Sequence, residues 1–153
     1  MNNQNQNDIL MIIDSNALVH RAYHALPSLT SPSGVLTNAA FGYFLILFKA
    51  IEEIKPKYIV ATFDVAAKTF RHEMFDKYKA TRIKAPDNLY AQIPIVKEIL
   101  QNMNIKILEA PGYEADDIIG TVVQKMKHNK NLDIIIVTGD LDTLQLIDNN
   151  VKV

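Results

Sequence analysis

The short segment "PGYEADDIIGT", residues 111–121, places three carboxylates within four positions at the start of an apolar stretch. Glu114, Asp116 and Asp117 repel one another there unless a positive group lies among them. Other acids follow three further apolar runs: Asp14 after "LMII", Asp64 after "VATF", and Asp140 and Asp142 within "TGDLDT". This spacing raises the question of which cation the acids share.

The chemistry of the donor atoms indicates the kind of cation. The 153 residues contain no cysteine, and no histidine adjoins any of these seven acids, so the donors are carboxylate oxygens. Such donors suit Mg²⁺ or Mn²⁺, whereas Zn²⁺ normally recruits imidazole or thiolate. Seven acids exceed the one or two carboxylates that a single Mg²⁺ usually takes. The set therefore predicts two metal ions and phosphoryl transfer by in-line displacement.

Each acid also has an ordinary structural interpretation. Acids at a helix N-terminus interact favourably with the helix dipole and with free N–H groups, which explains residues 114–117 alone about as well as metal binding does. A single Asp after a strand often belongs to a turn, as we expect for Asp148. Four such coincidences at one sheet edge are much less expected than one shared metal site, so we favour the metal site for the whole set.

The elements that must position these acids alternate between strands and helices. Apolar, β-branched runs predict strands at 8–13, 58–63, 105–109, 133–138 and 151–153. Helical patterns lie at 16–26, 38–55, 88–103, 114–128 and 142–147, with Asn38 and Asp87 as expected N-caps. Because the strands lack strict alternation, we predict an α/β fold with a largely parallel central sheet and helices on both faces. Ligands bind at the carboxyl edge of such a sheet.

Residues 66–86 fit neither the helical nor the strand periodicity, and they form a basic excursion from this pattern. Its basic and aromatic side chains are Lys68, Arg71, Lys77, Lys79, Arg82, Lys84, Phe70, Phe75 and Tyr78. Positive side chains bind phosphates, and aromatic rings stack on bases. This stretch beside an acidic edge therefore predicts a metal-dependent reaction on a polyanion. We expect Phe70 and Phe75, however, to pack into the core. Arg21, within "HRAYH", adds to the basic flank.

Length and composition set further bounds. The chain has one domain's length, and its 48% hydrophobic and 22% charged residues are typical of a soluble globular protein. The absence of cysteine predicts a cytoplasmic protein, and no apolar run is long enough to predict a membrane partner. We expect residues 1–7 to be a disordered polar tail and the protein to be a monomer. The final "VKV" ends within an expected strand, so the chain looks truncated at its C-terminus.

Four segments together resemble a known family. They are "IIDSNALVHRAYHALPSLTSPSG", "FDVAAKTFRHEMFDKYKATR", "PGYEADDIIGT" and "TGDLDTLQLI". In order and spacing over residues 8–153 they are similar to the flap-endonuclease family, in the form found as the 5′-nuclease domain of bacterial DNA polymerase I. The resemblance implies a PIN-like fold and a metal-dependent, structure-specific 5′–3′ exonuclease or flap endonuclease of replication and repair. Its implied partners are DNA with a 5′ flap, a nick or an RNA primer.

The resemblance also implies roles for individual residues. The acids that match the first metal site are Asp14, Asp64, Glu114 and Asp116. Those that match neighbours of the second are Asp117, Asp140 and Asp142. The catalytic basic pair at the scissile phosphate is matched by Lys79 and Arg82. Further DNA contacts are implied for Arg21, Arg71, Lys77 and Tyr78. Leu141 stands where many relatives have lysine, which removes a local cation.

Two alternatives remain beside the nuclease interpretation. The family's last pair of metal aspartates and its duplex-binding module have no match within the 153 residues, so a fragment that binds branched DNA without cleaving it is a second hypothesis. The segment "DLDT", residues 140–143, is similar to the motif of haloacid-dehalogenase phosphohydrolases. That motif normally follows the first strand, whereas here it follows the fourth expected strand, which disfavours the third hypothesis.

Overall fold

The computed structural model describes residues 7–65, 69–75 and 84–153. Most of the expected tail, residues 1–6, lies outside the described residues. The same holds for four expected DNA-contacting residues of the basic excursion: Lys77, Tyr78, Lys79 and Arg82. The roles expected for these residues therefore stay predictions.

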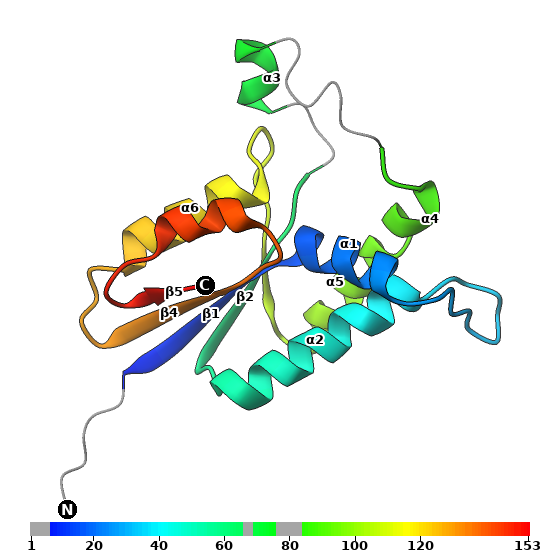
Figure 1. Cartoon of the computed structure of the whole chain (residues 1–153), viewed down its shortest axis with the longest axis horizontal. Coiled ribbons are helices and arrows are strands. Elements are labelled where there is room, and N and C mark those ends of the chain that lie inside the picture. Colours follow the sequence, from blue (N-terminus) through cyan, green and yellow to red (C-terminus); the bar gives the residue numbers. More distant parts are fainter. Residues whose placement is uncertain (1–6, 66–68, 76–83) are drawn as a thin grey trace, which may run out of the picture.

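Five strands form one parallel sheet in the order β3-β2-β1-β4-β5 (Figure 1). The strands are β1 (Asp8–Asp14), β2 (Tyr58–Thr62), β3 (Lys106–Leu108), β4 (Leu132–Val137) and β5 (Val151–Lys152). Every predicted strand is present, and each end differs from its prediction by no more than one residue. The predicted α/β fold with a parallel sheet is confirmed, and the carboxyl ends of the strands share one edge.

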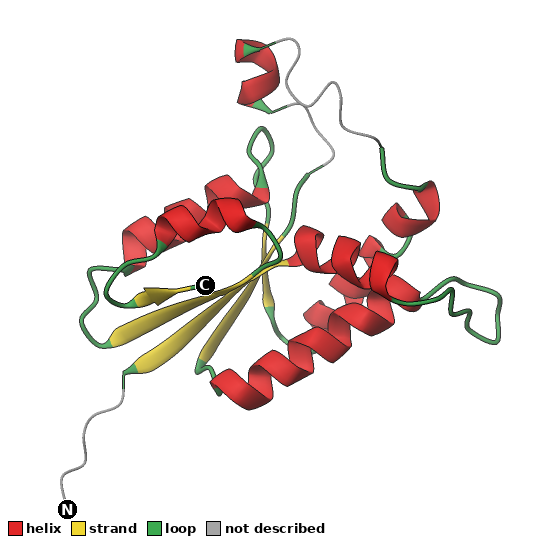
Figure 2. Ribbon diagram, viewed as in Figure 1, coloured by secondary structure: helices red, strands yellow, loops and turns green. Residues whose placement is uncertain are grey.

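Helices cover both faces of this sheet, as Figure 2 shows. The α-helices are α1 (Ser15–Ala25), α2 (Asn38–Ile54), α3 (Phe70–Met74), α4 (Asp87–Tyr90), α5 (Ile93–Asn102) and α6 (Ala115–Met126). The 3₁₀ helix η1 spans Leu141–Leu146. Helices α1, α2 and α5 pack on one face, whereas α6 and η1 pack on the other. No helix of the described residues is long and apolar enough to span a bilayer.

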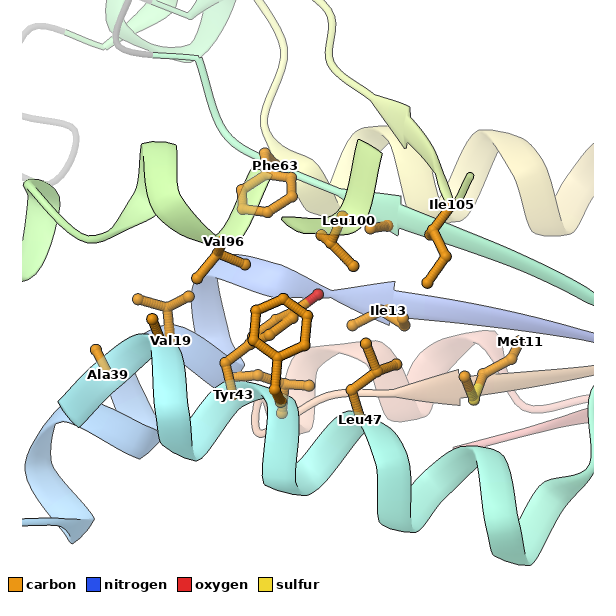
Figure 3. Packing of buried hydrophobic residues seen from close by; sticks show 14 of the residues in the cluster. Met11, Ile13, Val19, Ala39, Tyr43, Leu47, Phe63, Val96, Leu100 and Ile105 are labelled. Atoms are coloured by element: carbon orange, nitrogen blue, oxygen red, sulfur yellow. The ribbon is translucent and has the colours of Figure 1, made fainter. Parts of the chain in front are cut away.

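The alternation of side chains along β1 explains why its sequence is apolar throughout. Met11 and Ile13 pack into the core beneath α1, α2 and α5, together with Tyr43 (Figure 3). Leu10 and Ile12 point the other way and pack beneath α6. A strand buried on both faces needs apolar residues at every position, which is the pattern that predicted a parallel sheet.

Three helical details need correction or refinement. A proline inside the pattern at 88–103 predicts that the helix either starts there or kinks. The structure shows a start: the pattern forms two helices, α4 and α5, and Pro94 lies in the first turn of α5, where its missing N–H is tolerated. Asn38 is the first residue of α2 and does not cap it. The cap comes instead from Gln92, whose buried Oε1 accepts hydrogen bonds from the N–H groups of Ala39 and Ala40 at 2.8 and 3.2 Å. Asp87 likewise begins α4 and follows its N-cap residue.

Helices α1 and α2 approach each other closely at Gly42. A Cβ atom at this position would lie 2.8 Å from Cβ of Ala22 and 2.9 Å from Cδ1 of Leu26. Alanine is the better helix former by about 1 kcal/mol, but an overpacked core typically costs 1–3 kcal/mol. We therefore expect Gly42→Ala to lower the free energy of unfolding by up to about 2 kcal/mol in urea denaturation.

Gly120 in α6 provides the matched control for Gly42. The nearest atom to its added Cβ, Cδ2 of Leu146, is 4.0 Å away, so nothing opposes the gain in helix propensity. Gly120→Ala should raise the free energy of unfolding by up to about 1 kcal/mol. Stabilisation by both substitutions would show that α1 and α2 are not in close contact at Gly42.

Candidate metal and nucleic-acid site

Asp14 ends β1 and at the same time caps α1. Its side chain is buried, with Oδ1 accepting the N–H of Ala17 at 3.2 Å and Oδ2 accepting the hydroxyl of Thr138 at 2.7 Å. The same Thr138 Oγ1 accepts the N–H of Asp140 at 2.9 Å. Because β1 and β4 are neighbours in the sheet, one hydroxyl group links the acids that follow these two strands.

The charge of the Asp14 carboxylate is unfavourable in this position. Burial raises the pKa of Asp14, the hydrogen bonds from Thr138 and Ala17 oppose that rise, and the charges of Asp64 and Asp140 add to it. The net pKa lies above the ordinary value for aspartate. A cation beside these acids would therefore stabilise the ionised form.

Asp64 connects the end of β2 to the first turns of two helices. Its Oδ1 accepts the N–H of Ala115 at 2.7 Å, and its Oδ2 accepts Nδ2 of Asn16 at 2.9 Å. Ala115 is the first residue of α6, so the carboxylate lies at the positive end of that helix dipole. This contact brings the acids of α6 to the edge where β1 and β2 end.

Asp116 lies near four other carboxylates, and their charges add to the effect of burial on its pKa. Its side chain is exposed, yet partial burial of the carboxylate, followed by the charges of Asp14, Asp140, Asp64 and Glu114, raises its pKa to about 6. Five carboxylates from β1, β2, α6 and the β4–η1 turn thus lie close enough to repel one another. Such a group of acids favours a divalent cation.

Asp117, by contrast, has a cation from the protein itself. Arg71 Nη1 and Nη2 donate to its two oxygens at 2.6 and 2.7 Å, and Arg71 Nη1 also lies 4.0 Å from Glu114. The N–H of Glu114 donates to Asp117 Oδ2 at 2.9 Å. The ordinary interpretation of an acid at a helix N-terminus therefore describes Asp117 well.

The remaining two acids lie in the turn after β4. Asp140 caps η1, and its Oδ1 accepts the N–H of Asp142 at 2.9 Å. Asp142 is exposed. Leu141 stands between them with 77% of its surface exposed. The turn thus presents two carboxylates on either side of an apolar side chain.

The acids have the donor chemistry of a hard-cation site. In the ranges 7–65, 69–75 and 84–153, no group of three or more Asp, Glu or His side chains is arranged to hold a metal ion directly. Mg²⁺ usually binds proteins through one or two carboxylates and keeps several water ligands, so it does not require such a group. All-oxygen donors around Asp116 fit Mg²⁺ or Mn²⁺ better than Zn²⁺.

The structure describes two of the expected DNA-contacting residues. Arg21 is exposed on α1, and Arg71 is paired with Asp117. The prediction that Phe70 and Phe75 pack into the core is wrong, because these side chains are 38% and 66% exposed. The short helix α3 projects away from the sheet (Figure 1), and its two aromatic side chains therefore lie outside the core.

Sequence reasoning missed Asn16 and Thr138, the two neutral side chains that hold Asp64 and Asp14. Asn16 lies two residues after Asp14, and Thr138 lies two residues before Asp140. A polar residue that close to an acid at a strand end was the available signal. Their bonded partners are 48 and 124 residues away in the chain, so only the fold reveals the contacts.

A groove with a volume of about 690 Å³ runs beside this edge, between β3 and α6. Among its lining residues are Ile107, Leu108, Tyr113, Asp117 and Ile118. Of the seven acids, its lining includes only Asp117 among the residues that the structure describes. The carboxylates around Asp116 therefore form a surface separate from this groove.

The sequence of this chain matches a family described as "5′-3′ exonuclease, N-terminal resolvase-like domain" over residues 9–153. The chain belongs to this family. It is 48% identical over 144 residues to DNA polymerase I of Caldicellulosiruptor bescii and 44% identical over 144 residues to a 5′-3′ exonuclease of Aquifex aeolicus. Each alignment covers 94% of the chain, but 17% of the polymerase and 50% of the exonuclease. The chain thus spans at most about half of these relatives.

Solved structures support the fold. The bacteriophage T5 5′-exonuclease with bound zinc ions superposes with a TM-score of 0.75 and 19% identity, covering 94% of this chain and 54% of that one. The bacteriophage T5 flap endonuclease, in a pseudo-enzyme-product complex with DNA and metal ions, also gives a TM-score of 0.75, with 17% identity and the same coverage. The PIN-like fold predicted from the resemblance is therefore confirmed.

Proposed function

We propose that this chain is the nuclease domain of a metal-dependent, structure-specific 5′–3′ exonuclease or flap endonuclease that hydrolyses phosphodiester bonds in DNA with a 5′ flap, a nick or an RNA primer. The observation that supports it best is the set of carboxylates gathered around Asp116 at the carboxyl edge of the sheet, in a chain of the 5′-3′ exonuclease family. We also propose that the protein acts as a monomer in the cytoplasm.

Two divalent ions, Mg²⁺ or Mn²⁺, complete the proposed site. The residues proposed to hold the first ion are Asp14, Asp64, Glu114 and Asp116, and those proposed for the second are Asp140 and Asp142. Bound ions of this kind would activate water at neutral pH and neutralise charge on phosphate oxygens. Zinc, by contrast, would lack the imidazole or thiolate ligands that it prefers.

The chain's own residues orient the acids and the substrate. Thr138 and Asn16 hold Asp14 and Asp64 through hydrogen bonds of 2.7 and 2.9 Å, so these carboxylates need not reorganise during the reaction. We propose that Lys79 and Arg82 neutralise charge that develops on the phosphate as water adds to phosphorus and one phosphorus–oxygen bond breaks. The exposed Arg21 would contact the DNA backbone, and we propose DNA contacts for Lys77 and Tyr78 as well.

The proposal is tested with an end-labelled 5′-flap duplex, incubated with the complete gene product in Mg²⁺ or Mn²⁺. We expect cleavage near the flap junction, loss of cleavage in EDTA, and much slower cleavage of blunt duplex. Turnover of a small phosphomonoester without cleavage of the flap would instead support a phosphohydrolase.

A second candidate function is DNA binding without cleavage, which the basic side chains of residues 66–86 and Arg21 would support without a metal ion. Flap binding with no cleavage in either metal, unchanged by Asp116→Ala, would establish this second function. Cleavage that Asp116→Ala abolishes, with binding retained, would exclude it.

A further inference from the structure

We propose that Arg71 and Asp117 form a positioning pair, which fixes α3 to the N-terminus of α6 and serves neither as a DNA contact nor as a metal ligand. The pair thereby holds the start of the basic stretch against the acidic edge. This inference rests on the proposed nuclease function, and it assigns to both residues a role different from the one that the family resemblance implies.

The geometry of the pair is that of a strong ion pair. Both terminal nitrogens of Arg71 donate to the two oxygens of Asp117, at 2.6 and 2.7 Å, in a parallel arrangement. The side chains are 31% and 19% exposed, so solvent screens the interaction only in part. Bidentate arginine–carboxylate pairs are among the strongest hydrogen-bonded interactions in proteins and are specific in geometry. Lysine cannot reproduce this arrangement.

Two further contacts join the same two segments, and a third orients Arg71 within α3. The N–H of Phe70 donates to the carbonyl of Gly112 at 3.1 Å, and the rings of Phe70 and Tyr113 lie 5.8 Å apart. The Arg71 guanidinium lies 4.7 Å from the centre of the Phe70 ring. Figure 1 shows α3 away from the sheet, above the loop that leads into α6. These contacts thus fasten a helix that projects from the domain.

The same hydrogen bonds disfavour the two roles implied by the resemblance. Asp117 already accepts two bonds from Arg71 and one from the N–H of Glu114, so a metal ion would have to compete with these donors for the carboxylate oxygens. A DNA phosphate would likewise have to compete with the Asp117 carboxylate for the charge of Arg71. Asp116, the adjacent acid, lies instead among Asp14, Asp64 and Asp140. The acids of α6 therefore have different roles.

The consequence for the reaction follows from chain connectivity. Lys79 is eight residues after Arg71 in the sequence, and eight residues of fully extended chain span at most roughly 28 Å. Asp117 is covalently next to Asp116. Fixing Arg71 to Asp117 therefore raises the local concentration of the basic stretch at the acids and reduces the entropy lost on reaching the transition state.

The test compares Arg71→Gln, Asp117→Asn and the double variant in the complete gene product. We expect each single variant to lower kcat for flap cleavage about tenfold, with KM nearly unchanged, because a misplaced catalytic group slows the reacting step. The double variant should be no slower than either single variant, since both remove one interaction. Arg71→Lys should give an intermediate kcat, because it keeps the charge and loses the bidentate geometry.

Two binding measurements separate this role from the alternatives. The slope of log Kd for flap DNA against log salt should be unchanged in both single variants. A slope reduced by about one in Arg71→Gln alone would identify a phosphate contact and overturn the proposal. Mn²⁺ affinity should also be unchanged in Asp117→Asn and reduced in Asp116→Asn. A tenfold loss of Mn²⁺ affinity in Asp117→Asn would identify a metal ligand instead.

Hydrogen exchange distinguishes failure of this inference from failure of the proposed function. The amide of Phe70, which is bonded to Gly112, should exchange faster in Arg71→Gln and Asp117→Asn even if the protein cuts no DNA. Unchanged exchange would overturn the positioning role whatever the activity. Lys57→Gln is the matched control, because it breaks the 2.8 Å ion pair with Asp8 at the opposite edge of the sheet. It should change neither the exchange of this amide nor kcat.

Discussion

Replacing Lys79 by alanine is expected to lower kcat for flap cleavage about a hundredfold or more, while the affinity for the same DNA falls only severalfold. The difference arises because a phosphate contact is one of several in the bound state, whereas a cation at the scissile phosphate gains importance as charge develops in the transition state. Arg82→Ala should behave in the same way.

The two effects are measured separately. Single-turnover cleavage in Mg²⁺ gives the rate, and equilibrium binding in EDTA gives the affinity and its salt dependence. The slope of log Kd against log salt should fall by about one for each charge removed. Lys130→Ala is the control for lost charge, because this exposed lysine lies in the turn before β4, at the opposite edge of the sheet. Equal losses of rate and affinity for Lys79→Ala would show that Lys79 is an ordinary DNA contact and has no special role in the transition state.

The strands and the location of the acids were predictable because both follow from local sequence. In β1 the residues between Leu10 and Ile13 face both layers of the core, so the apolar pattern directly reports burial on two faces. Parallel pairing then brings Asp14 and the turn with Asp140 to one edge without any further information. The sheet order did not have to be known for this inference.

The interactions that hold the acids were not predictable in this way. Arg71 and Asp117 are 46 residues apart, and Thr138 lies 124 residues from Asp14, so neither pair leaves a local pattern. The cap of α2 by Gln92 is another long-range contact, and it made Asn38 a wrong prediction. The prediction that Phe75 packs into the core is wrong for a related reason, since hydrophobicity alone does not tell whether a short helix reaches the core.

The adjacent aspartates of "PGYEADD" thus differ in how their negative charge is balanced. Asp117 is neutralised by Arg71, a cation of the protein, and the ion pair also supports the first turn of α6. Asp116 is surrounded by other carboxylates, and their repulsion adds to the rise in its pKa. The negative charge that remains to be balanced therefore lies around Asp116.

Asp116→Asn is expected to raise the melting temperature of the metal-free chain while lowering flap cleavage in Mg²⁺ by about a hundredfold or more. The pKa of Asp116 rises from 3.8 to about 6 on folding, so the folded chain binds its proton more tightly than the unfolded chain does. The stability of the metal-free wild-type chain should consequently fall as pH rises from about 4 to about 6 and stay low above that range. Asparagine cannot ionise, and the variant should lack this fall.

The size of the effect is limited by solvent, because the side chain is exposed. Screening reduces the gain at pH 7 to about 1 kcal/mol or less, which corresponds to about 2–4 °C for a domain of this size. Asp148→Asn is the matched control. The N–H of Asn149, and then Lys127, lower the pKa of Asp148, so removing that charge should not stabilise the chain at neutral pH.

Added metal should reverse the order of the two melting temperatures. Millimolar Mg²⁺ or Mn²⁺ stabilises the wild-type chain by mass action, since the ion binds the folded state and offsets the repulsion around Asp116. Asp116→Asn removes one ligand and weakens that binding, so its melting temperature should rise much less. Thermal melts at pH 5 and 7, with and without metal, measure both parts. Equal metal-induced shifts in the wild type and in Asp116→Asn would show that the ion binds elsewhere, and the carboxylates around Asp116 would then no longer support the proposed nuclease site.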